Sequence, residues 1–205
     1  MAAASTIAGE ITRGMPRYVA LLRGINVGRH LVKMDWLRQQ FADLGFRSIS
    51  TLIASGNVLF ESPSSNTAGL ERRIEGHLES ALGYEVGTFL RTAAEIAAVA
   101  GYEAFPSAGE TAVYVLFLRG PLAREAQARV IGCGTKHDEF HVKGREVYWL
   151  ARAGMGRTAV NATALGKATG LATARNVNTV RKLAVLMSAP SARTPRSPRS
   201  RGSRR

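Results

Sequence analysis

Two glycine-containing loops carry side chains that could hold an anion. The first, Arg23-Gly24-Ile25-Asn26-Val27-Gly28, joins a short apolar stretch to a predicted helix. Its glycines permit positive φ, and a loop that enters a helix N-terminus turns backbone N–H groups outward, which suits an anion. The alternative is a tight connection in which Asn26 caps the chain. The motif lacks the Walker spacing and its lysine and is no G-x-G-x-x-G, so nucleotide binding of those types is unsupported.

The second loop, Gly154-Met155-Gly156-Arg157-Thr158, again places glycines before a helix, now with an arginine.

A third polar motif, Arg175-Asn176-Val177-Asn178-Thr179, leads into a helix that carries Arg181 and Lys182. Asn176 or Asn178 could serve only as an N-cap. Two amides, a threonine and three cations around one helix start exceed what capping requires, which favours a binding role. A fourth motif, Ser55-Gly56-Asn57, is explained by turn geometry, and we interpret it as structural.

The sequence shows no catalytic apparatus. No serine lies in a G-x-S-x-G elbow, and no pair of catalytic carboxylates can be picked out. His137, Glu139 and His141 alternate along a predicted strand and could converge on a metal, but an exposed polar edge strand is the favoured interpretation. Cys133 is interpreted as an idle thiol. We therefore assign no catalytic residue, no metal site and no cofactor.

Two successive β-α-β-β-α-β patterns must position these motifs. Hydrophobic periodicity and turn signals predict the elements of the first pattern: strand 17–22, a helix from Met34 to Leu44 closed by Gly45, strands 47–53 and 58–61, a helix through Leu70 and Leu82, and strand 85–90. A bridging helix follows, opened by a capping box of Thr92 and Glu95. The second pattern comprises strand 111–118, helix 121–131, strands 139–142 and 145–150, helix 158–169, strand 171–174 and a last helix through Met187.

This order is that of the ferredoxin-like unit, so the predicted fold class is α+β with two ferredoxin-like βαββαβ halves. We expect a disordered extension at 1–14, a first half with the bridging helix at 15–105, and a second half at 106–187. A disordered Ser/Pro/Arg tail is expected at 188–205. Met15 lies just before the first strand and is an alternative start to Met1.

The order of the strands also bears on where the loops meet. Strands one and three of such a sheet are expected to be adjacent and parallel, which would put the 23–28 loop and the Ser55–Asn57 turn at opposite ends. We therefore expect the 23–28 loop to share a site with the Arg175 turn.

The specific pair RGINVG and SGNVLF, together with the closing RNVNTVRKL, resembles the bacterial family known as domain of unknown function 1697. The resemblance covers about residues 15–187. It implies an α/β fold with ferredoxin-like halves and no established activity. Two departures stand out: Val177 replaces an aromatic residue, and Arg157-Thr158-Ala159 replaces a serine-lysine pair.

Charge and composition bound the partners. The net charge is +13, and Ser188–Arg205 contributes six arginines without an acid, which leaves +7 for residues 1–187. A basic fold favours phosphate-bearing or acidic partners, and the tail could bind nucleic acid weakly. A single cysteine fits a reducing, cytoplasmic setting, and no apolar run approaches the ~20 residues of a membrane span. The sequence does not indicate an oligomeric state.

The expected function is a binding module that holds an anionic, phosphate-bearing small molecule at the strand–helix junctions. The expected ligand-binding residues are Arg23, Asn26, Arg157, Arg175, Asn176, Asn178 and Lys182. The alternatives are an enzyme acting on a small phosphorylated or carboxylated metabolite, and a protein-interaction scaffold in which the asparagines merely cap.

Overall fold

The computed structural model describes residues 15–28, 31–54, 56–106 and 112–189. Within these ranges the chain forms two four-stranded antiparallel sheets, each with its own helices, in an α+β fold of two ferredoxin-like halves. The predicted extension 1–14 lies outside the described residues. So does the predicted tail 188–205, except Ser188, which ends the last helix, and Ala189.

The first half follows the predicted order of elements. It contains β1 (Arg17–Leu22), α1 (Met34–Asp43), β2 (Arg47–Leu52), β3 (Asn57–Glu61), α2 (Thr67–Leu82) and β4 (Thr88–Thr92). Its strands lie in the order β2-β3-β1-β4. The fourth strand begins three residues later than predicted, after a loop that contains Gly87.

The expectation that the first and third strands are parallel is wrong. β1 pairs antiparallel with β3, and Leu21 lies opposite Asn57. The chain crosses over through α1, so β2 runs in the direction of β1, and the β2–β3 hairpin then reverses the chain. The C-terminal end of β1 therefore lies beside the N-terminal end of β3.

The second half repeats this arrangement. It contains β5 (Val113–Leu118), α4 (Arg124–Ile131), β6 (Asp138–Lys143), β7 (Glu146–Ala151), the 3-10 helix η2 (Met155–Arg157), α5 (Ala162–Thr169) and β8 (Ala172–Asn176). Its strands lie in the order β6-β7-β5-β8. The predicted helix at 158–169 begins only at Ala162, because the side chain of Asn161 accepts a hydrogen bond from the Ala164 N–H and caps the helix there.

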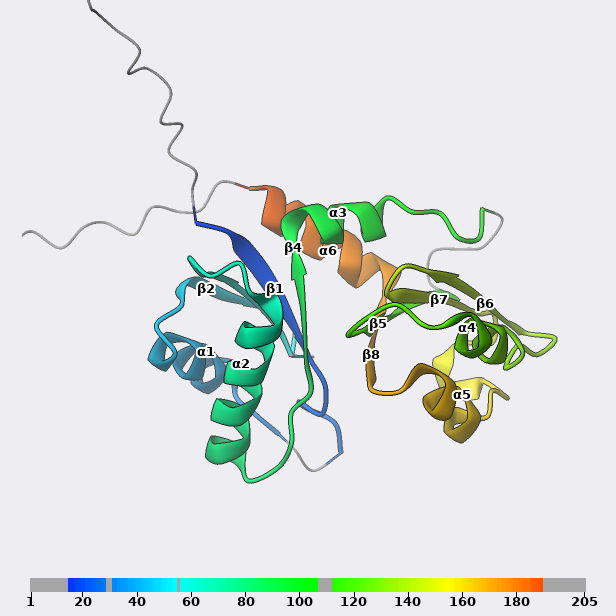
Figure 1. Cartoon of the computed structure of the whole chain (residues 1–205), viewed down its shortest axis with the longest axis horizontal. Helices are drawn as coiled ribbons and strands as arrows, with labels where there is room; N and C mark the ends of the chain where they lie inside the picture. Colours follow the sequence, from blue (N-terminus) through cyan, green and yellow to red (C-terminus); the bar gives the residue numbers. More distant parts are fainter. Residues whose placement is uncertain (1–14, 29–30, 55, 107–111, 190–205) are drawn as a thin grey trace, which may run out of the picture.

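Two helices lie where the halves meet. The bridging helix α3 (Ala93–Ala100) begins at the predicted capping box, in which Thr92 and Glu95 satisfy each other's backbone N–H groups. The last helix, α6 (Val177–Ser188), is capped by Asn176. α3 and α6 pack against each other across the top of both sheets in the view of Figure 1. No helix in the described ranges is both long and apolar enough to cross a membrane.

The molecule is layered, with the two sheets inside and helix pairs outside (Figure 1). α1 and α2 cover the outer face of the first sheet, and α4 and α5 cover the outer face of the second. The inner faces share one core, to which the sheets contribute Val19, Leu21, Phe89, Val115, Phe117 and Tyr148 and to which α3 and α6 also contribute. Burial of this shared core holds the halves together.

Candidate functional site

The loop that follows β1 is tied down at both ends. The N–H of Arg23 donates to the carbonyl of Gly87 at 2.7 Å, which holds the start of the loop beside β4. Asn26 adopts a positive φ of 55°, and its side chain closes the loop. Its Nδ2 donates to the carbonyls of Val32 (3.2 Å) and Ala54 (2.6 Å), and its Oδ1 accepts from the N–H of Val32 (2.6 Å). Asn26 therefore shapes the loop, while the Arg23 side chain is exposed.

The β2–β3 hairpin lies against this loop. The N–H of Leu22 donates to the carbonyl of Gly56 at 2.8 Å, and the side chain of Asn57 is fully buried. Ser55 lies outside the described residues, but Gly56 and Asn57 show that the expected placement of this turn at the opposite end of the sheet from the 23–28 loop is incorrect. The error came from the wrong strand direction. Asn57 also does more than form a turn, since its Oδ1 accepts a hydrogen bond from Arg175 in the other half.

Arg175, on β8, inserts its guanidinium into the first half and is only 8% exposed. Nε donates to Asn57 Oδ1 at 2.5 Å, and one terminal nitrogen donates to the carbonyls of Leu22 (2.8 Å) and Gly56 (3.4 Å). The other terminal nitrogen donates to Thr173 Oγ1 and the Ala174 carbonyl, both at 2.8 Å. All five N–H donors therefore meet neutral oxygen atoms. Burial lowers the pKa of Arg175 to about 10, which leaves it charged at neutral pH.

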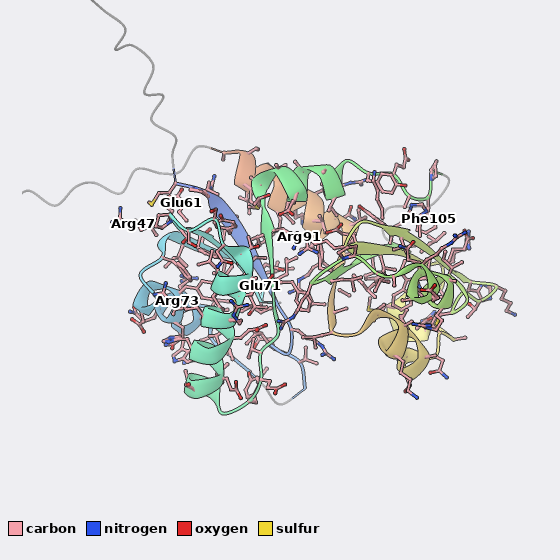
Figure 2. The ribbon with its side chains drawn as sticks, viewed as in Figure 1. Arg47, Glu61, Glu71, Arg73, Arg91 and Phe105 are labelled. Atoms are coloured by element: carbon pink, nitrogen blue, oxygen red, sulfur yellow. The ribbon has the colours of Figure 1, made fainter. Side chains whose placement is uncertain are left out.

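Arg91, on β4, makes the equivalent contacts in the opposite direction. Figure 2 labels its side chain where the two halves face each other. One terminal nitrogen donates to the carbonyls of Leu118 (2.8 Å) and Arg145 (3.2 Å), which correspond to Leu22 and Gly56. Its Nε, however, donates to a carboxylate, Glu146 Oε1, at 2.8 Å. Burial and the neighbouring Arg145 lower the pKa of Arg91, and Glu146 opposes that shift. The buried charge is thus neutralised at this junction and not at the other.

A second pair of equivalent arginines also differs in whether a carboxylate partner is present. Arg23 and Arg119 each follow the last residue of a central strand and precede a glycine, in the repeated triplets 22–24 and 118–120. Arg119 forms an ion pair with Glu75 at 2.5 Å across the interface. Neither Arg23 nor Arg175 has a carboxylate within ion-pair distance among the described residues. We call the junction that contains Arg23 and Arg175 the cationic junction.

The cationic junction borders a cavity of about 560 Å³. Its walls are the loop residues 22–27, Ile53 and Ala54 of the first half, and residues 172–175 of the second. None of these wall residues is acidic. A neighbouring cavity of about 600 Å³ shares Arg23, Gly24 and Val27 but adds Glu75, Glu79, Glu85 and Arg119, so its charge is mixed. An anion is therefore better accommodated in the first cavity.

The structure brings only part of the predicted site together. Arg23, Asn26 and Arg175 line one cavity, as the expectation of a site shared by the 23–28 loop and the Arg175 turn requires. Four other predicted residues lie elsewhere: Asn176, Asn178, Arg157 and Lys182. Asn176 pairs with Tyr114 at the far end of β8, and its Oδ1 accepts from the N–H of Asn178. Arg157 is exposed on η2, and Lys182 is exposed on α6 beside Leu52, Val185 and Leu186.

Two of the residues weighed for metal binding have other partners. Glu139 forms an ion pair with Arg152, and His141 Nε2 lies 2.8 Å from Tyr102 Oη. Cys133 is half-buried and packs against the core of the second half. The described ranges contain no cluster of three or more histidine, cysteine, aspartate or glutamate residues that could hold a metal ion.

The fold and the paired junctions define a class of protein with two ferredoxin-like halves whose sheets face each other through one shared core. Residues 15–148 match the model of the family described as Protein of unknown function (DUF1697), and the chain belongs to that family. This confirms the resemblance drawn from RGINVG and SGNVLF. The closing RNVNTVRKL lies beyond the matched residues.

One solved structure with a similar fold is that of conserved bacterial protein SP0830 from Streptococcus pneumoniae. The sequence identity is 24%, the TM-score is 0.66, and the alignment covers 86% of this chain and all of the other. At this identity the likeness shows the fold alone. No curated protein matches the sequence.

Proposed function

We propose that this protein is a binding module that holds an anionic, phosphate-bearing ligand at the cationic junction. The observation that carries the proposal is the buried guanidinium of Arg175, which has no carboxylate partner within the described part of the chain, whereas Arg91 at the equivalent place is paired with Glu146. A buried charge is costly unless it is neutralised. An anion in the adjoining cavity would provide the neutralising charge.

Arg23 and Arg175 would have different roles in binding the anion. Every N–H of Arg175 is already bonded within the protein, so Arg175 would act through its positive potential and through the loop that it fixes. The exposed Arg23 side chain lines the cavity and would donate directly to the anion. Asn26 would hold the loop in place. No residue in this cavity is assigned a catalytic role.

The test is a thermal-shift screen of the full chain with inorganic phosphate, sugar phosphates, nucleotides and oligonucleotides, at constant ionic strength against chloride. A ligand that binds only the native state must raise its melting temperature. We expect at least one phosphate-bearing compound to do so, and Arg23→Ala to abolish the rise. Arg72→Ala, which removes an exposed arginine from α2, is the matched control and should respond like the wild type. The proposal is wrong if no anion stabilises the wild type, or if Arg23→Ala responds as strongly.

A second variant tests the missing counter-charge. Asn57→Asp places a carboxylate beside Arg175 Nε, as Glu146 does for Arg91. We expect the affinity for the anion to fall at least about tenfold, for two reasons. The new carboxylate repels the anion, and it already neutralises the charge of Arg175. Asn66→Asp is the control, because it makes the same charge change at the exposed N-cap of α2, where aspartate caps as well as asparagine.

We also propose a cytoplasmic setting for this function. Cys133 is the single cysteine of the sequence, and its neighbourhood in the core of the second half offers no disulfide partner among the described residues. Fractionation of cells that express the untagged protein would test this, and recovery from an oxidising compartment would contradict it.

A further inference from the structure

A third cavity opens at the cationic junction, between α5 and the second sheet. Its volume is about 200 Å³, and it shares Arg23 and Ala172 with the cavity in which the anion is proposed to bind. Its walls include Leu116, Trp149, Val160, Leu165 and Gly166. A group bonded to an anion at Arg23 can therefore extend into it.

Apart from Arg23, the polar side chains in the walls of this third cavity already form hydrogen bonds within the protein. The indole N–H of Trp149 donates to Asp138 Oδ1 at 2.9 Å, and Thr158 Oγ1 donates to the same oxygen at 2.9 Å. Thr169 Oγ1 donates to the Leu165 carbonyl at 3.0 Å. The polar atoms of these wall residues are thus engaged within the protein. Among the residues that the structure describes, none with a carboxylate lines the cavity, so an apolar group is the occupant that it suits.

The volume of this third cavity limits the chemical class of its ligand. A dry apolar cavity of about 150 Å³ accepts benzene, so a cavity of about 200 Å³ has room for one six-membered ring. Gly166 contributes to that room, because a Cβ built on it would meet no atom within 4 Å. We infer that the ligand is a ring-bearing anion, with its phosphate or carboxylate at Arg23 and its aromatic or apolar ring against Trp149 and Leu165. This inference rests on the proposed function and goes beyond it by naming the body of the ligand.

The experiment compares dissociation constants, measured by calorimetry on the full chain, for phenyl phosphate, benzoate, glucose 1-phosphate and inorganic phosphate. We expect phenyl phosphate or benzoate to bind at least about tenfold more tightly than inorganic phosphate, because burial of the ring removes apolar surface from water. The key variant is Gly166→Leu, which fills the cavity from a helical position that tolerates leucine. It should remove the advantage of the ring and leave the affinity for inorganic phosphate unchanged.

The matched control is Gly76→Leu, at a helical glycine of α2 that is also exposed and also has open space at its Cβ. It should change none of the four dissociation constants. The inference is overturned if the aromatic ring confers no advantage, if glucose 1-phosphate, whose ring is polar, binds more tightly than both aromatic compounds, or if Gly166→Leu retains the full advantage. Binding of inorganic phosphate in those cases would leave the proposed anion site standing, whereas absence of binding by all four compounds would overturn both.

Discussion

Arg91 and Arg175 occupy equivalent places in the two halves, and each inserts its guanidinium into the opposite half. Both donate to the carbonyl of the last residue of the opposite central strand, Leu118 in one case and Leu22 in the other. They differ in the acceptor at Nε, which is the carboxylate of Glu146 for Arg91 and the amide of Asn57 for Arg175. One junction is therefore electrically balanced and the other is cationic.

Glu146→Gln should destabilise the protein by about 3 kcal/mol, because it leaves the fully buried Arg91 without its ion-pair partner. Urea unfolding at neutral pH measures the change. The control is Glu139→Gln, which breaks an ion pair whose two side chains are 48% and 52% exposed. It should cost less than about 1 kcal/mol. Equal losses in the two variants would show that Glu146 does not stabilise the junction by its charge.

Asp138→Asn should make the free energy of unfolding depend less on pH in the acid range. Burial opposes ionisation of Asp138, but hydrogen bonds from Thr135, Trp149 and Thr158 outweigh it and hold the pKa of the carboxyl below its ordinary value. A carboxyl with a lowered native pKa stabilises the fold fully above its ordinary pKa of about 4 and loses that contribution as the pH falls through the native value.

Unfolding free energies measured from pH 7 to pH 2 test this. The wild type should lose more stability over the acid range than Asp138→Asn does. The exposed Asp35→Asn, whose side chain is 88% exposed, should keep the wild-type slope. Parallel profiles for the wild type and Asp138→Asn would contradict the prediction.

Deletion of residues 190–205 should leave the melting temperature within about 1 °C of the full chain. The segment contains six arginines and no large apolar side chain, so it has almost nothing to bury. The cut spares the contacts of Arg17 with the carbonyls of Met187 and Ala189. Binding to a single-stranded oligonucleotide at low salt should weaken on deletion, and its salt dependence should become shallower. A fall of several degrees on deletion would show that the segment packs on the fold.

Cys133 should react with a thiol reagent at least about tenfold more slowly in the native protein than in denaturant. The residue is half-buried at the end of α4, and its N–H donates to the Val130 carbonyl. A thiol is reactive when a neighbouring cation or helix N-terminus favours its thiolate, and Cys133 follows a helix C-terminus. Rapid stoichiometric labelling of the native protein would contradict the prediction.

Local patterns predicted the fold well. The apolar spacing of α2, the capping box of Thr92 and Glu95, and the hairpin about Gly144 each depend on neighbours in sequence, and each was confirmed. The errors were in strand direction and in element ends. The first helical turns predicted before α4 and α5 are absent, and the Asn161 cap explains the later start of α5.

The candidate site was harder to predict because its key contacts join residues far apart in sequence. Arg175 and Asn57 are separated by 118 positions, and nothing in either local motif indicates that they meet. Two local signals are present in the sequence. One is the repeated triplet at 22–24 and 118–120, and the other is an arginine directly before a helix N-cap, at Arg91-Thr92 and at Arg175-Asn176. Together they indicate that Arg91 and Arg175 occupy corresponding positions in the two halves, but not which residues they contact.

The crossed arginines give this single chain the geometry of an isologous dimer whose two subunits have been joined end to end. In a true homodimer, any substitution appears at both copies of the contact, so a neutral junction and a charged one could not coexist. Covalent linkage removes that constraint, since Asn57 and Glu146 can vary independently. The contact at Arg91 can thus retain the carboxylate of Glu146 and stabilise the packing of the two halves. The contact at Arg175 can then lose its carboxylate and acquire a different role.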